Sequence, residues 1–202
     1  MRPIYRTPSA IAGGVLLFPK GISVPIATTD IKFKYATSAG AAGNSNAGAA
    51  NSSLGKYIST TEVPTATLNA LFDDISGAEN AALDVEYRCV FIHNSHGSLT
   101  LTAPILWVEA QVADGASVAI GLDTTAPTVI ASAPVQALTV ATEQDAPAGV
   151  VFSTPITKGT GLALASIPAG QCAAFWVKRT AANSDAMNGD GFTFRVEGDT
   201  GA

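Results

Sequence analysis

The chain has 202 residues, of which 47% are hydrophobic and only 13% are charged, and its formal net charge is −5. A chain of this length can bury a sizeable core without a metal or a disulfide. Its eleven Lys and Arg residues are scattered, which disfavours sequence-independent nucleic-acid binding, because that activity needs a concentrated basic face. The charged fraction is well below the roughly 25% of typical globular proteins. Such a composition indicates a surface that is covered in an assembly, although an Ala-rich soluble protein would share it.

The first part of the chain is predicted to be largely extended. Residues 1–38 contain four prolines, which interrupt any helix, and residues 31–35 alternate apolar and basic side chains, as a half-buried strand does. Residues 39–53 are rich in Ala, Gly, Asn and Ser, and are expected to be flexible unless a neighbouring subunit orders them. We therefore divide the chain into an extended N-terminal arm with a low-complexity segment at residues 1–60 and a β-sandwich domain at residues 61–202.

The N-terminus has some features of a signal peptide. Arg2 and Arg6 precede an apolar run at residues 11–18, but Pro19 and Lys20 stand where a small-residue cleavage site would be needed. No apolar stretch reaches the roughly 18 residues that span a bilayer. We expect an unprocessed protein that is made in a bacterial cytoplasm and has no membrane partner.

Residues 63–83 contain the best helix candidate. Four apolar side chains fall at helical spacing on one face, namely Leu68, Leu71, Phe72 and Ile75. Thr65 or Thr67 is the expected N-cap and Gly77 the expected end. A second helical turn is predicted over residues 78–83.

From residue 84 onward the pattern predicts strands and turns. The segment Val85–His93 is apolar almost throughout, which is typical of a central strand, and Asp114 with Gly115 favours a tight hairpin. Many short strands separated by turns indicate an all-β fold, here a β-sandwich or jelly-roll-like domain with one short helix. The other predicted strands are residues 99–103, 105–112, 116–122, 150–152, 162–164, 172–178 and 192–197.

The sequence contains no recognised catalytic, phosphate-binding or dinucleotide-binding motif. His93 and His96 are three residues apart but lack a third metal ligand nearby, so they are interpreted as turn residues. Asp73 and Asp74 are adjacent, which is poor geometry for an acid–base pair, and are assigned to a solvated helix end. Residues 185–191 lack the ligand spacing of a calcium loop and are predicted to form a hairpin turn. We expect no catalytic residue, no cofactor and no metal.

The two cysteines and two tryptophans all lie in strand-like runs. Cys89 and Cys172 are far apart in the sequence and are predicted to be buried, reduced thiols, while a disulfide between facing strands stays open. Trp107 and Trp176 have apolar neighbours, which favours a place in the core or an interface over a platform for stacking ligands.

Three basic residues lie at or near predicted strand ends. Arg88, Lys178 and Arg179 are interpreted as solvated charges at the rim of the domain, and an ion pair between subunits is the alternative. Neither interpretation assigns them to a site of chemistry.

Three stretches together resemble strands of tailed-bacteriophage virion proteins. These are residues 86–94 (EYRCVFIHN), the segment from Ile167 to Arg179 that contains IPAGQ and WVKR, and residues 191–200 (GFTFRVEGDT). The resemblance covers about residues 70–202 and concerns framework strands, so it implies a structural particle component and transfers no functional residue.

The resemblance and the composition together lead to an expected function. We expect a non-enzymatic head decoration, or cement, protein in the virion, which bridges major capsid subunits and forms a homo-oligomer or a symmetric array. The extended arm would add strands to neighbouring subunits. Two alternatives stay open: a neck or tail component, such as an adaptor or fibre-attachment subunit, and a carbohydrate-binding module for host attachment.

Overall fold

The computed structural model describes residues 25–39, 46–130, 135–185 and 189–201. The described chain is mostly β, as the sequence predicts, with a single short α-helix among these residues. Residues 1–24, which make up much of the expected arm, and residues 40–45 of the low-complexity segment lie outside the described residues.

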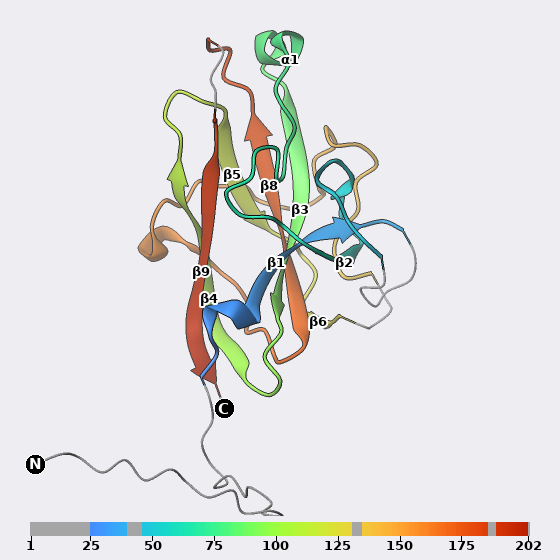
Figure 1. Cartoon of the computed structure of the whole chain (residues 1–202), viewed down its shortest axis with the longest axis vertical. Helices are drawn as coiled ribbons and strands as arrows, with labels where there is room; N and C mark the ends of the chain where they lie inside the picture. Colours follow the sequence, from blue (N-terminus) through green and yellow to red (C-terminus); the bar gives the residue numbers. More distant parts are fainter. Residues whose placement is uncertain (1–24, 40–45, 131–134, 186–188, 202) are drawn as a thin grey trace, which may run out of the picture.

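The strands form two antiparallel sheets that pack as a sandwich (Figure 1). The large sheet has the order β2-β1-β3-β8-β5, with β6 also paired to β8, and the small sheet has the order β7-β4-β9. The strands are β1 (Ile31–Thr37), β2 (Tyr57–Glu62), β3 (Val85–Asn94), β4 (Thr100–Gln111), β5 (Ser117–Leu122), β6 (Thr128–Val129), β7 (Leu162–Ala163), β8 (Gln171–Thr180) and β9 (Phe192–Gly201). The helix α1 is Gly77–Ala82, and short 3-10 turns are η1 (Thr28–Asp30), η2 (Ala50–Ser52) and η3 (Lys158–Thr160).

The main core lies between the two sheets. Side chains alternate along a strand, so Val90 and Ile92 of β3 face the small sheet together with Phe175 and Val177 of β8. They meet apolar side chains of β4, of which Leu106 is fully buried.

A second core covers the opposite face of the large sheet. Residues 135–157, which we call the cover segment, run across this face and bring Ala137 and Val140 against Phe91 and Trp176. The strands β3 and β8 are therefore buried on both faces, which explains why their sequences are apolar almost throughout. The prediction of a central strand at residues 85–93 is confirmed, because β3 lies between β1 and β8.

Aromatic side chains of β9 connect the two sheets. Phe192 and Phe194 lie next to each other on the inward face of β9, with ring centroids 4.9 Å apart. Phe194 packs edge-on against Phe175 of the large sheet at 5.3 Å, and Phe192 contacts Phe72 at 6.2 Å. Aromatic pairs of this kind contribute about 0.5–1.5 kcal/mol beyond the area they bury.

The helix predicted over residues 63–76 is wrong. Ala66 and Asn69 have φ angles of 53° and 56°, which a right-handed helix does not allow. The helix begins only at Gly77, the residue expected to end it, because Ser76 and Glu79 form a capping box in front of it. The second helical turn predicted for residues 78–83 is confirmed by α1.

The predicted hairpin at Asp114 and Gly115 is also wrong. This turn joins β4 of the small sheet to β5 of the large sheet, so the two strands are not paired. The hairpin turn predicted at residues 185–191 is not formed either, because β8 and β9 belong to different sheets, and Asp190 accepts a hydrogen bond from the Ala116 amide at 2.7 Å. The two strands predicted at residues 99–103 and 105–112 form one strand, β4, with a bulge before Ile105.

The N-terminal part of the described chain is integrated into the sandwich. β1 pairs with β3 along five consecutive residue pairs, and the predicted division at residue 60 falls inside β2. At the end of the low-complexity segment Ser53 is fully buried, and its hydroxyl donates to the Cys89 carbonyl oxygen and accepts from the Ala36 amide. Contacts within the chain therefore hold this end of the segment.

The Trp176 side chain offers a test of the core. It is fully buried, and its indole Nε1 donates to Asp123 Oδ2 at 2.7 Å. We expect Trp176→Ala to lower the free energy of unfolding by about 3–5 kcal/mol, because it opens a cavity in the core, and Trp176→Phe to cost less because the ring is kept. Chemical denaturation of both variants measures this. A loss of under about 1 kcal/mol for the alanine variant would contradict the burial of this ring.

Candidate functional site

Two arginines lie inside the sandwich at the end next to α1. Arg88 of β3 and Arg179 of β8 point toward the small sheet, on the same face as the main core. Arg88 is fully buried and Arg179 is 9% exposed. The interpretation of both as solvated rim charges, or as ion pairs between subunits, is therefore wrong.

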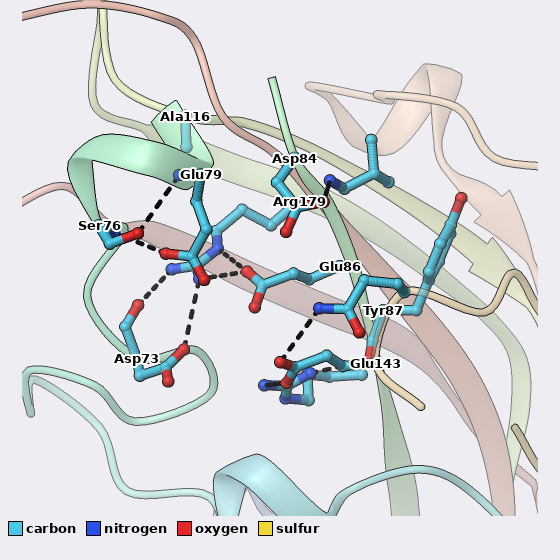
Figure 2. Close-up of polar contacts among 12 residues, drawn as sticks. Asp73, Ser76, Glu79, Asp84, Glu86, Tyr87, Ala116, Glu143 and Arg179 are labelled. Atoms are coloured by element: carbon cyan, nitrogen blue, oxygen red, sulfur yellow. Dashed lines mark hydrogen bonds and ion pairs between the residues drawn. The ribbon is translucent and has the colours of Figure 1, made fainter. Parts of the chain in front are cut away.

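Arg179 is held by carboxylate and carbonyl oxygens of its own chain, as Figure 2 shows. Its Nε donates to Glu86 Oε2 at 2.7 Å, and its Nη2 donates to the same oxygen. Its Nη1 donates to the Asp73 carbonyl oxygen, and the Asp73 carboxylate lies 3.5 Å from Nη2. Asp73 thus fixes the loop before α1 to β8. It is exposed, as predicted, but it lies in a loop and not at a helix end.

Arg88 forms the second half of this charge cluster. Its Nη2 donates to Glu143 of the cover segment and its Nη1 to the Tyr87 carbonyl oxygen at 3.2 Å. The Glu143 carbonyl oxygen in turn accepts the Tyr87 amide at 2.7 Å. The guanidinium therefore ties the cover segment to the free end of β3, beyond the last residue that pairs with β1.

Phe72 lies against both guanidinium groups. Its ring centroid is 4.6 Å from the Arg179 guanidinium carbon and 5.2 Å from that of Arg88. An aromatic face attracts a desolvated cation by about 2 kcal/mol. Phe72 therefore connects the charge cluster to the aromatic contacts of β9.

The buried carboxylate of Glu86 depends on its arginine partner. Burial raises the pKa of Glu86, and the hydrogen bonds and charge of Arg179 oppose that rise. Two charges taken out of water gain little net free energy from their pairing, but removing one of them leaves the other uncompensated. The charge cluster thus fixes the geometry of this end of the fold.

A test of the charge cluster is the substitution Arg179→Met. We expect it to lower the free energy of unfolding by about 3–5 kcal/mol, because Glu86 is left buried without a cation, and Glu86→Gln in the same chain to restore part of the loss. The control is Lys32→Met, which removes the exposed Lys32–Glu62 pair and should cost less than about 1 kcal/mol. Equal losses of unfolding free energy for Arg179→Met and Lys32→Met in chemical denaturation would contradict the argument.

A second group of titratable side chains lies on the covered face of the large sheet. His93 of β3 stands opposite Cys172 of β8 and opposite Lys32 of β1, with Lys34 two residues further along β1. His93, Cys172 and Lys34 are buried. His93 Nδ1 has no hydrogen-bond partner within the described residues. His93 was predicted to be a turn residue, and it instead lies inside a strand; His96 does lie in the following turn, where its Nδ1 accepts the Leu99 amide at 3.0 Å.

Burial disfavours the charged forms of His93 and of Cys172. It lowers the pKa of His93 to about 4, with Lys34 and Lys32 adding to the effect. It raises the pKa of the Cys172 thiol to about 12, whereas an active nucleophilic cysteine needs a lowered pKa. The thiol is therefore protonated at neutral pH, which is the behaviour of a small core residue.

The shift at His93 makes stability depend on pH. The pKa of His93 falls from 6.5 to about 4 on folding. The stability that the protein gains from a neutral His93 is therefore fully present above pH 6.5 and is lost as the pH falls through 4. We expect the free energy of unfolding of the wild type to drop across this range by up to about 3 kcal/mol more than that of His93→Gln. The control His96→Gln should keep the wild-type dependence. Parallel curves for His93→Gln and the wild type would refute the prediction.

The other sequence-based predictions concern cysteine and tryptophan. Cys89 and Cys172 are both buried and form no disulfide, as predicted. Trp176 lies in the covered core, and Trp107 is also buried, on the outer face of the small sheet beneath the Arg195 guanidinium at 5.9 Å. Both tryptophans are therefore core residues, and neither presents a ring face for stacking a ligand.

The open edge of the small sheet is the third feature. β9 pairs with β4 on one side, and no backbone group of the described chain pairs with its other side. Beside this free edge runs a hollow whose walls come from the start of the described chain and from β9. The apolar side chains lining it are Ile26, Ile31, Phe33, Leu101, Phe194 and Val196.

Sequence reasoning missed the charge cluster and the free edge. A signal for the first is present: Glu86 and Arg88 interrupt an apolar strand on the same face, and a buried strand carries charges only where they are paired. The second has no local signal, because an edge is a property of strand order.

Among the described residues no three His, Cys, Asp or Glu side chains are grouped to hold a metal ion. None of the helices in this part of the chain is long and apolar enough to cross a membrane. Comparison with known proteins finds no matching family model, no matching curated protein and no matching solved structure.

Proposed function

We propose that this protein is a structural subunit of a tailed-bacteriophage particle, and specifically a head decoration protein that bridges major capsid subunits. The resemblance of its strands to phage virion proteins motivates the proposal. The quoted stretches fall on β3, on β8 with the turn before it, and on β9. Those strands carry the charge cluster and the free edge, so the resemblance concerns the framework of the fold.

One observation carries the proposal: apolar side chains stand out on a surface that has few charges. Val151 is 82% exposed and Ile156 is 66% exposed. They lie in the part of the cover segment that pairs with β5 at Ser153 and reaches β4 at Pro155. Three of the eleven basic residues, Lys34, Arg88 and Arg179, are buried inside the fold. A free monomer normally keeps a charged exterior without apolar patches, whereas a subunit packed into a shell buries such side chains.

The experiment is a measurement of copy number. Particles of the phage that encodes the chain would be purified and analysed by quantitative mass spectrometry, with the major capsid protein as the internal standard. We expect a copy number in a fixed ratio to the capsid subunits, because a cement protein occupies every equivalent position of the shell.

Two other results would contradict the proposal. A copy number far below that of the capsid protein would place the subunit at the neck or tail. Absence from washed particles would remove the structural role altogether.

As an internal control, Val151→Asp with Ile156→Asp should lower particle occupancy while leaving the thermal unfolding of the purified protein unchanged, since both side chains are exposed.

A further inference from the structure

The free edge of β9 differs from every other long edge of the described sandwich. The edge of β2 is covered, because the Asn46 carbonyl oxygen accepts the Thr60 amide at 2.9 Å and the Gln136 side chain accepts the Ile58 amide. The edge of β5 is covered by the cover segment, in which Ser153 pairs with Ile120. β9 is ten residues long and has no such cover among the described residues.

The hollow beside β9 has the form of a vacant strand position. One wall is β9 from Phe194 to Thr200, and the other is the chain from Ile26 to Phe33. A strand that adds to a sheet edge gains backbone hydrogen bonds on one side and places alternate side chains on each face. Here one face of an added strand would meet Phe33 and Phe194, whose rings already contact each other across the sandwich at 6.5 Å.

We propose that the free edge of β9 receives the apolar run at residues 11–18 from a second copy of this chain. This inference rests on the proposed structural role and describes how copies of the subunit join. The run has the sequence IAGGVLLF and is followed by Pro19, so it has the length and the end of a single strand.

The charges of the two partners are complementary. Residues 1–24 contain three basic residues and no acidic residue. The rest of the chain carries all sixteen acidic residues and only eight basic ones, and β9 carries Glu197 and Asp199 against one basic residue, Arg195. Attraction between the basic segment and an acidic neighbouring copy would speed their association.

A second copy fits the hollow better than the chain's own segment. The first part of the described chain, drawn in blue, lies beside the end of β9 in Figure 1, and Ile26 and Thr200 line the same hollow. Proline restricts the residue before it to extended geometry, and Pro19 and Pro25 stand at the two ends of the connection, so a return of the same chain along β9 would have to turn within residues 20–23. Twenty-four extended residues span about 80 Å, so the run of one copy reaches the edge of another.

The test is crosslinking between two singly substituted proteins. Leu16→Cys is placed in one protein and Thr193→Cys, exposed on β9, in the other, and the mixture is treated with a short bismaleimide. The native Cys89 and Cys172 are buried and stay unreactive. We expect a crosslinked dimer in about tenfold higher yield than with the control Ala141→Cys, an exposed position in the cover segment, because pairing raises the local concentration of the two thiols.

A second cysteine variant lies outside residues 11–18, because Leu16→Cys changes the strand that the run is proposed to form. Ser9→Cys leaves residues 11–18 intact and should also crosslink to Thr193→Cys in preference to Ala141→Cys. Equal yields at the two positions would overturn the proposal. So would crosslinking that occurs only within one chain when Ser9→Cys and Thr193→Cys are combined, because the strand would then come from the same copy.

A deletion separates this inference from the proposed function. Removing residues 1–24 leaves β1 and all its pairs in place, so the thermal stability should be kept while self-association, measured by light scattering, is lost. Unchanged self-association would overturn the strand exchange. A high copy number on particles with no self-association would support the decoration role alone, and self-association of a protein absent from particles would refute that role while supporting the exchange.

Discussion

The pairing of β3 with β8 is the constraint on which the rest of the molecule depends. Their register runs without interruption from Val85 opposite Thr180 to His93 opposite Cys172. Because side chains alternate along both strands, this register sends one set of apolar side chains to the small sheet and the other set to the cover segment. It also places Glu86 opposite Arg179, so the buried ion pair is a direct result of the same register.

The charge cluster gives that register its specificity. A slip of one residue would turn every side chain of β8 to the other face, and Arg179 would then enter the covered core without a carboxylate. The cost of an unpaired buried charge is several kcal/mol, comparable to a large part of the net stability of a domain. The cluster therefore acts against wrong pairings more than it adds to the stability of the correct one.

Local patterns predict the strands well and their arrangement poorly. Runs such as Val85–His93 and Phe192–Glu197 appear in the structure as strands because their apolar periodicity reflects burial that any sandwich would provide. Asp114 and Gly115 predict a hairpin that does not form. A turn sequence determines the local bend of the chain, but it does not determine which sheet each flanking strand joins. The helix expected over residues 63–76 is absent because its apolar side chains do not share one buried face: Leu71 and Phe72 are buried in the main core, whereas Leu68 is 76% exposed.

The treatment of the sheet edges also bears on how the protein works. Irregular segments of the same chain cover β2 and β5 with backbone and side-chain hydrogen bonds, which is how monomeric β proteins avoid pairing with one another. At β9 the edge is protected only by the charged side chains of exposed Arg195 and Asp199 and of half-buried Glu197, and Arg195 and Glu197 are already paired to each other. Among the described residues, two edges are covered and the ten-residue β9 is left open beside a hollow lined by apolar and charged side chains, which suits this edge to the addition of a strand. In a shell of many identical subunits each such addition can be weak, because the number of simultaneous contacts determines the stability of the whole.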